Sequence, residues 1–478
     1  MTVKAASQPP LSRREFIGAS ALATSAVALA PQAGAQRRAK PAPTKPNIVF
    51  IHTDQQSLSA MSAHGCEHVY APNMDRLAAR GMSFQMSYSA NPVCCPARSC
   101  WYTGRTSAET GVVRNSWPID ETMPDLGQWF NGNGYEAVYA GKWHVPGRNF
   151  RNSFRVISPG TGIGEHSDGA SSRATEAFLH SYSGDKPFFL SLGLLQPHDI
   201  CYWVFEHVPR LEELPYPQIA DELPPLPDNF EYDPREPETF IKHWRQRGKT
   251  FRDNWSETQW RYYQWAYFRS VEMADAEIGR VLDAVEDSGH ADDTLIIFTA
   301  DHGDGHARHQ MISKMYMYDE AAAVPFVAAF PGQMGEGIMD SDHLVSGLDV
   351  APTICDYAGI PAPPKARGRS LRPVFEGRPS AEREFIVSEV FTTGRMVRTP
   401  EYKLITYQGD ETDQLFDMRA DPGETKNLFG DATHADTHAD LRKRLAEWES
   451  HLEPISLEDR QSIKPPKPKP RRGQNARQ

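Results

Sequence analysis

The sequence predicts an α/β fold: a large, mostly parallel sheet sandwiched by helices, followed by a smaller C-terminal antiparallel α+β domain. Apolar strand patterns alternate with helical patterns between residues 47 and 330, which is typical of a parallel sheet covered on both faces. From residue 383 short strand patterns follow one another instead. A chain of 478 residues is long enough for both parts. We therefore predict a large domain over 47–382 and a small domain over 383–460.

The large domain is predicted to begin with a strand at 47–53, because its continuous apolar residues are typical of a strand buried on both faces. Further strands are predicted at 136–140, 187–194, 294–300 and 324–330. The helices between them include one opened by Pro72 and one near 125–130. The longest is predicted at 261–287, where apolar side chains recur at helical spacing: Tyr263, Tyr267, Val271, Ala274, Ile278, Val281 and Val285.

The small domain is predicted to contain four short strands and one final helix. The strands are expected at 385–387, 395–398, 402–407 and 414–418, and the helix at 435–451. Strands separated by such short connections pair in the antiparallel sense, because a parallel pair needs a long crossover.

The first 35 residues are interpreted as a twin-arginine export signal and not as part of the fold. Arg13 and Arg14 precede an apolar run at 19–30 and an A-x-A cleavage site at 33–35, so residues 36–46 form a linker. Such a signal directs a folded protein to the periplasm or the medium. The alternative is an uncleaved membrane anchor, but the run is short and Ala-rich. No other segment reaches spanning length, so we expect no membrane insertion.

The formal net charge of −11 argues against nucleic acid as a partner, so any anionic substrate needs a local basic pocket. The basic, Pro-rich tail at 461–478 is expected to be disordered; it could contact an anionic polymer or simply be a solvated end. The six cysteines predict neither a disulfide framework nor a zinc site: Cys66, Cys94, Cys95, Cys100, Cys201 and Cys355.

An aromatic-rich stretch lies between residues 201 and 268. Exposed aromatic side chains can stack on sugar rings, but for any one of them packing into the core is the stronger expectation. The side chains concerned are Tyr202, Trp203, Trp244, Trp255 and Trp260.

The segment 94–105 has features that suit anion chemistry. Pro96 favours the first position of a helix, which places Cys94 near the positive end of the helix dipole, where free N–H groups attract sulfate or phosphate. Arg98 lies four residues after Cys94, so both can face one side of the first turn. The alternative is a buried cysteine beside a structural arginine.

Polar residues follow two of the predicted strands. Asp54 and Gln55 come after the first strand, and Asp301 and His302 after the strand at 294–300. Because ligand sites in open parallel sheets lie beyond the carboxyl ends of the strands, these residues can converge. Carboxylate oxygens suit a hard divalent cation, and an imidazole widens the choice of metal. A single Asp at such a place is more commonly a helix cap.

The pattern Cys94-x-Pro96-x-Arg98 followed by Thr103-Gly104-Arg105 resembles the signature of the type I sulfatase family, part of the alkaline phosphatase superfamily. The resemblance covers nearly the whole mature chain and makes 47–382 the catalytic domain. It implies that a formylglycine-generating enzyme converts Cys94 to formylglycine, whose hydrated aldehyde is the nucleophile.

The resemblance also implies the metal ligands Asp54, Gln55, Asp301 and His302, together with the modified Cys94. Calcium is the first choice of metal, with manganese or magnesium as alternatives. Many members have Asp-Asp and Asp-Asn where this chain has Asp-Gln and Asp-His.

The remaining site residues implied by the resemblance surround the reacting group. Arg98, Lys142 and Lys314 would stabilise charge on the sulfuryl oxygens. His198, alone or together with Lys314, would protonate or stabilise the leaving alcohol, and His144 would take a proton when sulfate is expelled. His309 is a weaker candidate, as a residue supporting the site from behind.

The expected function is hydrolysis of sulfuric esters, on sulfated carbohydrate or aryl sulfate. The Asp-Gln and Asp-His pairs also fit a phosphonate monoester or phosphodiester hydrolase on the same scaffold. A third alternative is an inactive protein that binds sulfated glycan with Cys94 unmodified. Its weakness is that such a protein has no need of His144 and His198.

Overall fold

The computed structural model describes residues 45–160, 162–204, 217–246, 254–456 and 459. The predicted export signal and basic tail, and nearly all of the predicted linker, lie outside these residues. Among the described residues no helix combines the length and the apolar character that crossing a membrane requires.

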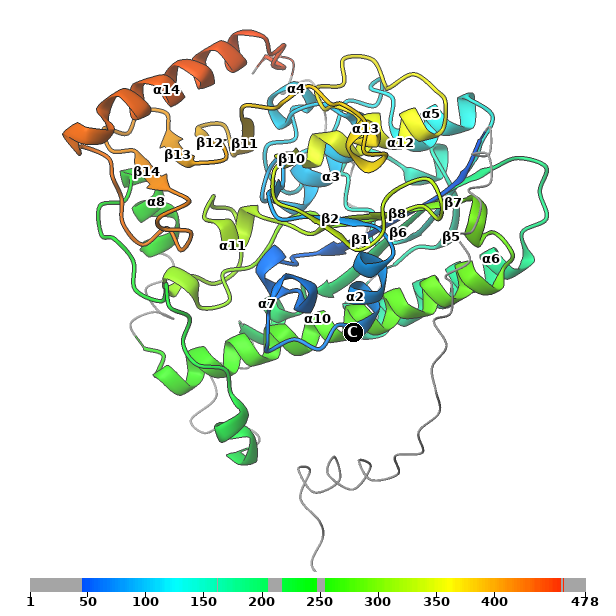
Figure 1. Ribbon diagram of the computed structural model, residues 1–478, viewed down its shortest axis with the longest axis horizontal. Coiled ribbons are helices and arrows are strands. Elements are labelled where there is room, and N and C mark those ends of the chain that lie inside the picture. Colours follow the sequence, from blue (N-terminus) through cyan, green and yellow to red (C-terminus); the bar gives the residue numbers. More distant parts are fainter. Residues whose placement is uncertain (1–44, 161, 205–216, 247–253, 457–458, 460–478) are drawn as a thin grey trace, which may run out of the picture. The chain divides into compact units, whose positions relative to one another are not determined.

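A mixed sheet of eight strands, in the order β5-β4-β6-β1-β7-β8-β2-β9, forms the centre of the large domain (Figure 1). The strand β1 lies between β6 and β7 and is parallel to both. Only β8 runs antiparallel to its neighbours, so the prediction of a mostly parallel sheet is confirmed. The strands are β1 Asn47–Asp54, β2 Met82–Phe84, β4 Glu136–Gly141, β5 Arg155–Ser158, β6 Phe188–Pro197, β7 Thr294–Ala300, β8 Phe326–Ala329 and β9 Ile338–Asp340.

Helices cover both faces of this sheet (Figure 1). One face carries α10 Glu257–Asp287, α6 Gly164–Ser181 and α2 Pro72–Ala79. The other carries α3 Cys94–Thr103, α5 Leu126–Gly132, α12 Val350–Tyr357 and α13 Arg372–Phe375.

Strand β1 shows how the sequence specifies these two layers. Ile48 and Phe50 pack into the core beneath α3, whereas Val49 and Ile51 pack into the core beneath α10. Successive side chains of a strand point to opposite faces, so a strand covered on both faces is apolar throughout.

The long helix α10 begins at a capping box, in which the Ser256 side chain accepts from the backbone N–H of Gln259 and the Gln259 side chain accepts from that of Ser256. All seven apolar residues used to predict this helix are buried.

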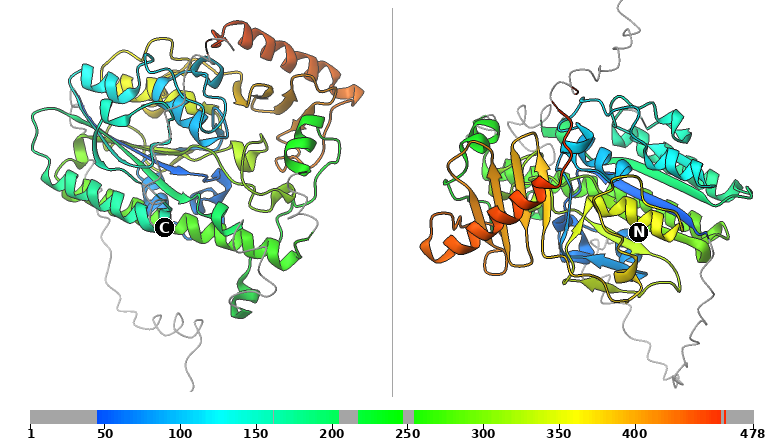
Figure 2. Two further views of the ribbon diagram at one scale, coloured as in Figure 1. Left: turned by 180° about the vertical axis from the view of Figure 1, so that it is seen from behind. Right: turned by 90° about the horizontal axis from the view of Figure 1, so that it is seen from above.

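The C-terminal sheet is antiparallel, in the order β11-β12-β13-β14. Helix α14 lies across one face of it (Figure 2, right), with Leu441 and Leu445 buried against Val397 and Leu404. The predicted α+β character is therefore confirmed. The elements are β11 Ile386–Val390, β12 Gly394–Arg398, β13 Tyr402–Tyr407, β14 Gln414–Asp417 and α14 Ala435–Ser450.

Short elements complete the connections. A two-stranded parallel sheet joins β3 Ser87–Tyr88 to β10 Val345–Ser346. The remaining short helices are α4 Ser107–Thr110, α7 Ile200–Tyr202, α8 Glu238–Phe240 and α11 Asp319–Ala322.

Leu445→Ala should lower the free energy of unfolding by about 2–5 kcal/mol, because it leaves a cavity between α14 and the small sheet. Denaturant titration measures this change. Lys443→Ala, on the exposed side of the same helix, is the matched control and should change stability by less than about 0.5 kcal/mol. Equal stability of both variants would contradict the packing described for α14.

Candidate functional site

Four of the site residues lie at or just after the carboxyl ends of four neighbouring parallel strands. These strands lie side by side in the order β4-β6-β1-β7. Lys142 follows β4 and His198 follows β6, while Asp54 ends β1 and Asp301 follows β7. Because parallel strands end at the same edge of the sheet, residues up to 247 positions apart (54 to 301) meet at one place.

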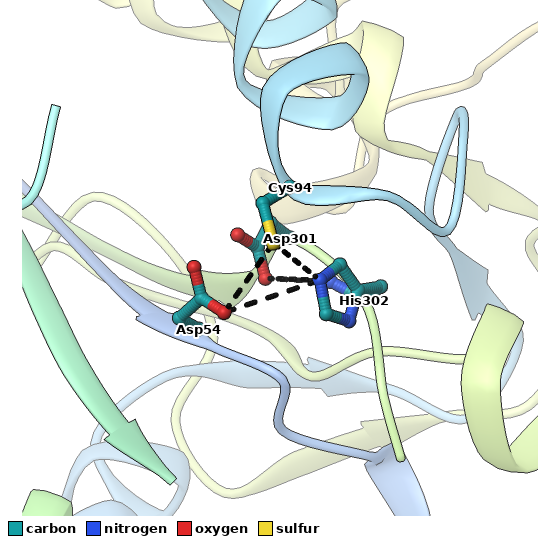
Figure 3. Close-up of side chains that lie close together, drawn as sticks. All are labelled: Asp54, Cys94, Asp301 and His302. Carbon is teal, nitrogen blue, oxygen red and sulfur yellow. Dashed lines mark hydrogen bonds and ion pairs between the residues drawn. The ribbon is translucent and has the colours of Figure 1, made fainter. Parts of the chain in front are cut away.

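The centre of the site is a group of four residues that could hold a metal ion (Figure 3). One ligand atom from each of Asp54, Cys94, Asp301 and His302 lies within 4.8 Å of every other. All four side chains are fully buried. Two carboxylates, an imidazole and a sulfur that stands where a formylglycine oxygen would lie form a donor set suited to a divalent cation.

Helix α3 positions Cys94 at its first residue, and all ten residues of this helix are buried. Pro96 is the third residue of the helix and not the first, as the sequence suggested, but it still lies in the first turn, where it has no hydrogen bond to lose. The helix ends at Gly104, whose φ of +71° and close approach to Ala366 suit only glycine. The Thr-Gly-Arg part of the signature therefore closes the helix that carries Cys94.

The Arg98 guanidinium joins the two carboxylates of the site. Its Nε donates to Asp301 Oδ2 at 2.8 Å and its Nη2 to Asp54 Oδ2 at 3.1 Å, while Nη1 donates to the carbonyl of Lys142 at 2.9 Å. The side chain has no exposed surface. These bonds give Arg98 a part in positioning Asp54 and Asp301. Its expected contact with the sulfuryl oxygens stays a prediction.

Two lysines supply positive charge beside Cys94 and Asp54. Lys314 Nζ lies 3.1 Å from Cys94 Sγ and 3.8 Å from Asp54 Oδ1. Lys142 Nζ lies 2.5 Å from Asp54 Oδ2. Both side chains retain a small exposed fraction, 6% for Lys314 and 10% for Lys142, so they border the opening of the site while Arg98 lies behind it.

The position of residue 94 favours an anion. Burial and the Asp54 carboxylate raise the pKa of the Cys94 thiol, but the charges of Lys314, Lys142 and His302 outweigh them and hold this pKa well below its usual value. Cys95 shows the contrast one residue away, because burial and the neighbouring Cys94 raise the pKa of its thiol to about 12. The electrostatic environment therefore singles out Cys94 among the adjacent cysteines.

The two carboxylates differ in their affinity for protons. Burial raises the pKa of Asp54, but the charges of Lys142, Lys314 and Arg98 lower it by more, so its pKa lies well below the usual range. Burial and the charge of Asp54 raise the pKa of Asp301 to about 6. Two buried carboxylates so close together attract a cation, which is the electrostatic requirement of a divalent metal site.

Gln55 is held in a left-handed backbone conformation (φ 74°) beside these ligands. The backbone N–H of Gln55 donates to Asp301 Oδ1 at 3.0 Å, and the side-chain oxygen of Gln55 accepts from Lys314 Nζ at 2.6 Å. Its Nε2 donates to Asp304 Oδ2 at 2.6 Å. Its predicted role as a metal ligand stays a prediction, whereas its contact with Lys314 is given by the structure.

Two histidines lie at the opening. His198 Nε2 is 4.0 Å from Asp54 Oδ1, and burial together with Lys314 lowers the pKa of His198 to about 3. His198 is therefore neutral at pH 7. His144, two residues after Lys142, has a φ of 52°. Within the described residues, Nδ1 of each ring is buried without a hydrogen-bond partner. The proton-transfer roles of both histidines stay predictions.

His309 does not support the site. Its Nδ1 lies 3.0 Å from Glu320 Oε1 and its Nε2 lies 2.9 Å from the carbonyl of Gly423, while its ring stacks on Tyr318. These contacts tie the loop after β7 to the C-terminal part of the chain. The expectation that His309 supports the catalytic residues is therefore wrong.

Sequence reasoning missed three residues that orient Gln55. Asp304 accepts from Gln55 and from the hydroxyl of Tyr263, and Cys201 Sγ lies 3.1 Å from Gln55 Nε2. Asp304 follows Asp301 and His302 closely in the sequence, and this closeness could have identified it as a site residue. Tyr263 and Cys201 gave none, because the periodicity of α10 marks Tyr263 only as a core residue.

Comparison with known proteins agrees with this geometry. The Sulfatase family model matches residues 46–360, and a model described as N-sulphoglucosamine sulphohydrolase, C-terminal, matches residues 307–451. This chain belongs to the sulfatase family. The sulfatase is thus a sulfuric ester hydrolase, as the signature predicted, and its membership of the family accords with a metal and formylglycine in the site.

Three known proteins are similar to the sulfatase in sequence or in fold. It is 32% identical to the Delta 4,5-hexuronate-2-O-sulfatase of Bacteroides thetaiotaomicron over 432 residues, 84% of this chain and 89% of the relative. The solved structure of a 2-O GAG sulfatase has 29% identity and a TM-score of 0.74, covering 88% and 97% of the two chains. The phosphonate monoester hydrolase of Agrobacterium radiobacter has 21% identity and a TM-score of 0.72, covering 85% and 96%, which is a likeness of fold alone.

Arg98→Ala should destabilise the sulfatase by about 3–5 kcal/mol, because it leaves two buried carboxylates without their shared partner. Denaturant titration measures the loss. The matched control is Arg105→Ala, since within the described part of the chain the Arg105 side chain donates only to the carbonyl of Pro364. Loss of this bond should cost about 1 kcal/mol. An Arg98→Ala protein as stable as the control variant would contradict the role given to Arg98.

Proposed function

We propose that the sulfatase removes a sulfate group from an anionic, uronate-containing saccharide, using formylglycine at position 94 and one divalent cation. One observation carries the proposal. Cys94 Sγ lies 3.1 Å from Lys314 Nζ and 3.2 Å from His302 Nε2, at the first residue of a buried helix. A nucleophile placed beside a lysine ammonium at a helix N-terminus is suited to attack on a tetrahedral oxyanion.

Asp54, Asp301 and His302 would hold the cation together with residue 94. Bound there, the cation would make a hydroxyl on residue 94 more acidic and neutralise charge on the sulfate. Calcium is the proposed ion because oxygen ligands predominate, with manganese or magnesium in reserve because His302 adds a nitrogen ligand. Hydrated formylglycine would supply a hydroxyl nucleophile. When the second hydroxyl of the sulfated hydrate loses a proton, the C–O bond to sulfate would break and the aldehyde would be restored, and a water molecule would then hydrate it again.

The other side chains have separate tasks in this proposal. Lys314 and Lys142, at the opening, would hold the sulfuryl oxygens and stabilise the charge that develops on them. His198, which is neutral, would donate a hydrogen bond to the leaving alcohol oxygen. His144 would accept the proton released when the aldehyde is restored. Arg98 would keep Asp54 and Asp301 aligned throughout.

The substrate class rests on the relatives. The 32% identical protein is named a Delta 4,5-hexuronate-2-O-sulfatase, and identity of this level extends over most of both chains. We extend this substrate type to the present chain. The sequence of residues 1–35 supports export by the twin-arginine pathway to the periplasm or medium, where such saccharides are met. A formylglycine-generating enzyme would have to act before export.

The second candidate is hydrolysis of phosphonate monoesters or phosphodiesters. The fold of a phosphonate monoester hydrolase is similar, and the Asp54-Gln55 and Asp301-His302 pairs suit both esters. Binding of sulfated glycan without turnover is less favoured, because Lys142, His198 and Lys314 all converge on Cys94 and Asp54.

Cys94 should be found as formylglycine in protein co-expressed with a formylglycine-generating enzyme, while Cys95 and Cys100 remain thiols. Peptide mass spectrometry across residues 94–105 measures this directly, with a Cys94→Ala protein as the unmodifiable control. Active protein carrying an intact Cys94 thiol would contradict the proposal.

The value of kcat/KM for a 2-O-sulfated unsaturated uronate disaccharide should exceed that for an aryl phosphonate monoester by at least about tenfold, equivalent to ~1.4 kcal/mol of transition-state stabilisation. Steady-state kinetics with both substrates on one enzyme preparation show which substrate has the larger kcat/KM. The reverse order would favour the second candidate, and binding without turnover of either ester would favour the glycan-binding alternative.

A further inference from the structure

One aromatic side chain of the 201–268 stretch is exposed beside the site. Of the five aromatic residues named in that stretch, Trp244 and Trp260 are buried and Trp203 and Trp255 are half-buried, whereas Tyr202 is 43% exposed. Packing into the core therefore accounts for Trp244 and Trp260, but it does not account for the exposed position of Tyr202.

Tyr202 belongs to the turn that begins at His198. The backbone N–H of Cys201 donates to the carbonyl of His198, and that of Tyr202 to the carbonyl of Asp199. Residues four apart in such a turn lie on one side, so the Tyr202 ring meets the His198 ring edge to face, with centroids 5.8 Å apart. Since His198 Nε2 lies 4.0 Å from Asp54 Oδ1, Tyr202 lies directly outside the site.

The neighbours of Tyr202 hold this turn in place. Trp203 stacks on Tyr262 of α10, with centroids 5.1 Å apart, and Ile200 is buried. Cys201 contacts the side chain of Gln55 on the inner side. The Tyr202 ring is therefore presented to solvent by a turn fixed on both sides, and it needs little ordering before it binds a ligand.

We propose that Tyr202 is a specificity-determining residue that stacks against a sugar ring of the substrate. This inference rests on the proposed function. An aromatic face packs against the C–H face of a pyranose, and the phenol hydroxyl can meet sugar hydroxyls at its edge. His198, which would face the leaving alcohol, touches Tyr202, so the sugar carrying the sulfate, or the sugar joined to it, would meet this ring.

The test separates binding of the saccharide from binding of sulfate. For Tyr202→Ala, KM for the 2-O-sulfated disaccharide and the inhibition constant of the desulfated disaccharide should each rise about tenfold. The inhibition constant of inorganic sulfate and kcat should stay within about twofold, because sulfate reaches only the inner pocket. Tyr202→Phe keeps the aromatic face and should stay near wild type, whereas Tyr202→Leu keeps apolar bulk without the flat face and should behave as Tyr202→Ala does. Tyr70→Ala, at a tyrosine 76% exposed elsewhere on the surface, is the control.

Two results would overturn the inference while leaving the proposed function intact. One is unchanged constants for both disaccharides in the Ala and Leu variants. The other is a parallel loss of kcat and of sulfate inhibition, which would mean that Tyr202 acts only by shielding His198. A wild-type enzyme that desulfates no uronate saccharide but cleaves another sulfate ester would instead refute the proposed substrate, and this inference with it.

Discussion

The paired hydrogen bonds from Arg98 to Asp54 and Asp301 are the constraint on which the site depends. Two buried carboxylates within a few ångströms repel each other and each loses hydration, so they stay together only if buried cations compensate them. Arg98 supplies fixed compensation from behind, while Lys142 and Lys314 supply it from the opening. The two carboxylates, Cys94 and His302 keep one ligand atom each within 4.8 Å of the others, so a divalent cation could bind between them.

The fold makes this arrangement possible in two ways. The parallel strands β4, β6, β1 and β7 end at one edge and bring Lys142, His198, Asp54 and Asp301 together. Helix α3 then brings Cys94 and Arg98 to the same place from the other layer. Since every residue of α3 is buried, Cys94 and Arg98 are held in place by the packing of the helix that carries them. Lys142, Lys314 and His198 are the slightly exposed groups around Asp54, whereas Arg98 is fully buried.

Much of this was predictable from the sequence, because strong patterns specify it. The apolar run of β1, the helical periodicity of α10 and the signature from Cys94 to Arg105 each had one dominant explanation. Helix α6 was missed because its buried face is made of small polar residues such as Ser171 and Thr175, which carry no hydrophobic periodicity. The antiparallel direction of β8 was hidden because strand patterns do not encode direction. Arg98 contacts carboxylates 44 and 203 positions away, and His309 contacts a backbone carbonyl 114 positions away, which no local pattern reveals.

Metal content tests the central claim most directly. Purified sulfatase should hold about one divalent cation per chain by elemental analysis, since the carboxylates, His302 and residue 94 form one site. Asp54→Asn and Asp301→Asn should each lose most of it. Asp275→Asn, which alters a buried carboxylate that caps α2 instead, should keep it. Full metal occupancy in the Asp54 or Asp301 variant would contradict the account, because the carboxylates joined by Arg98 would not be what holds the ion.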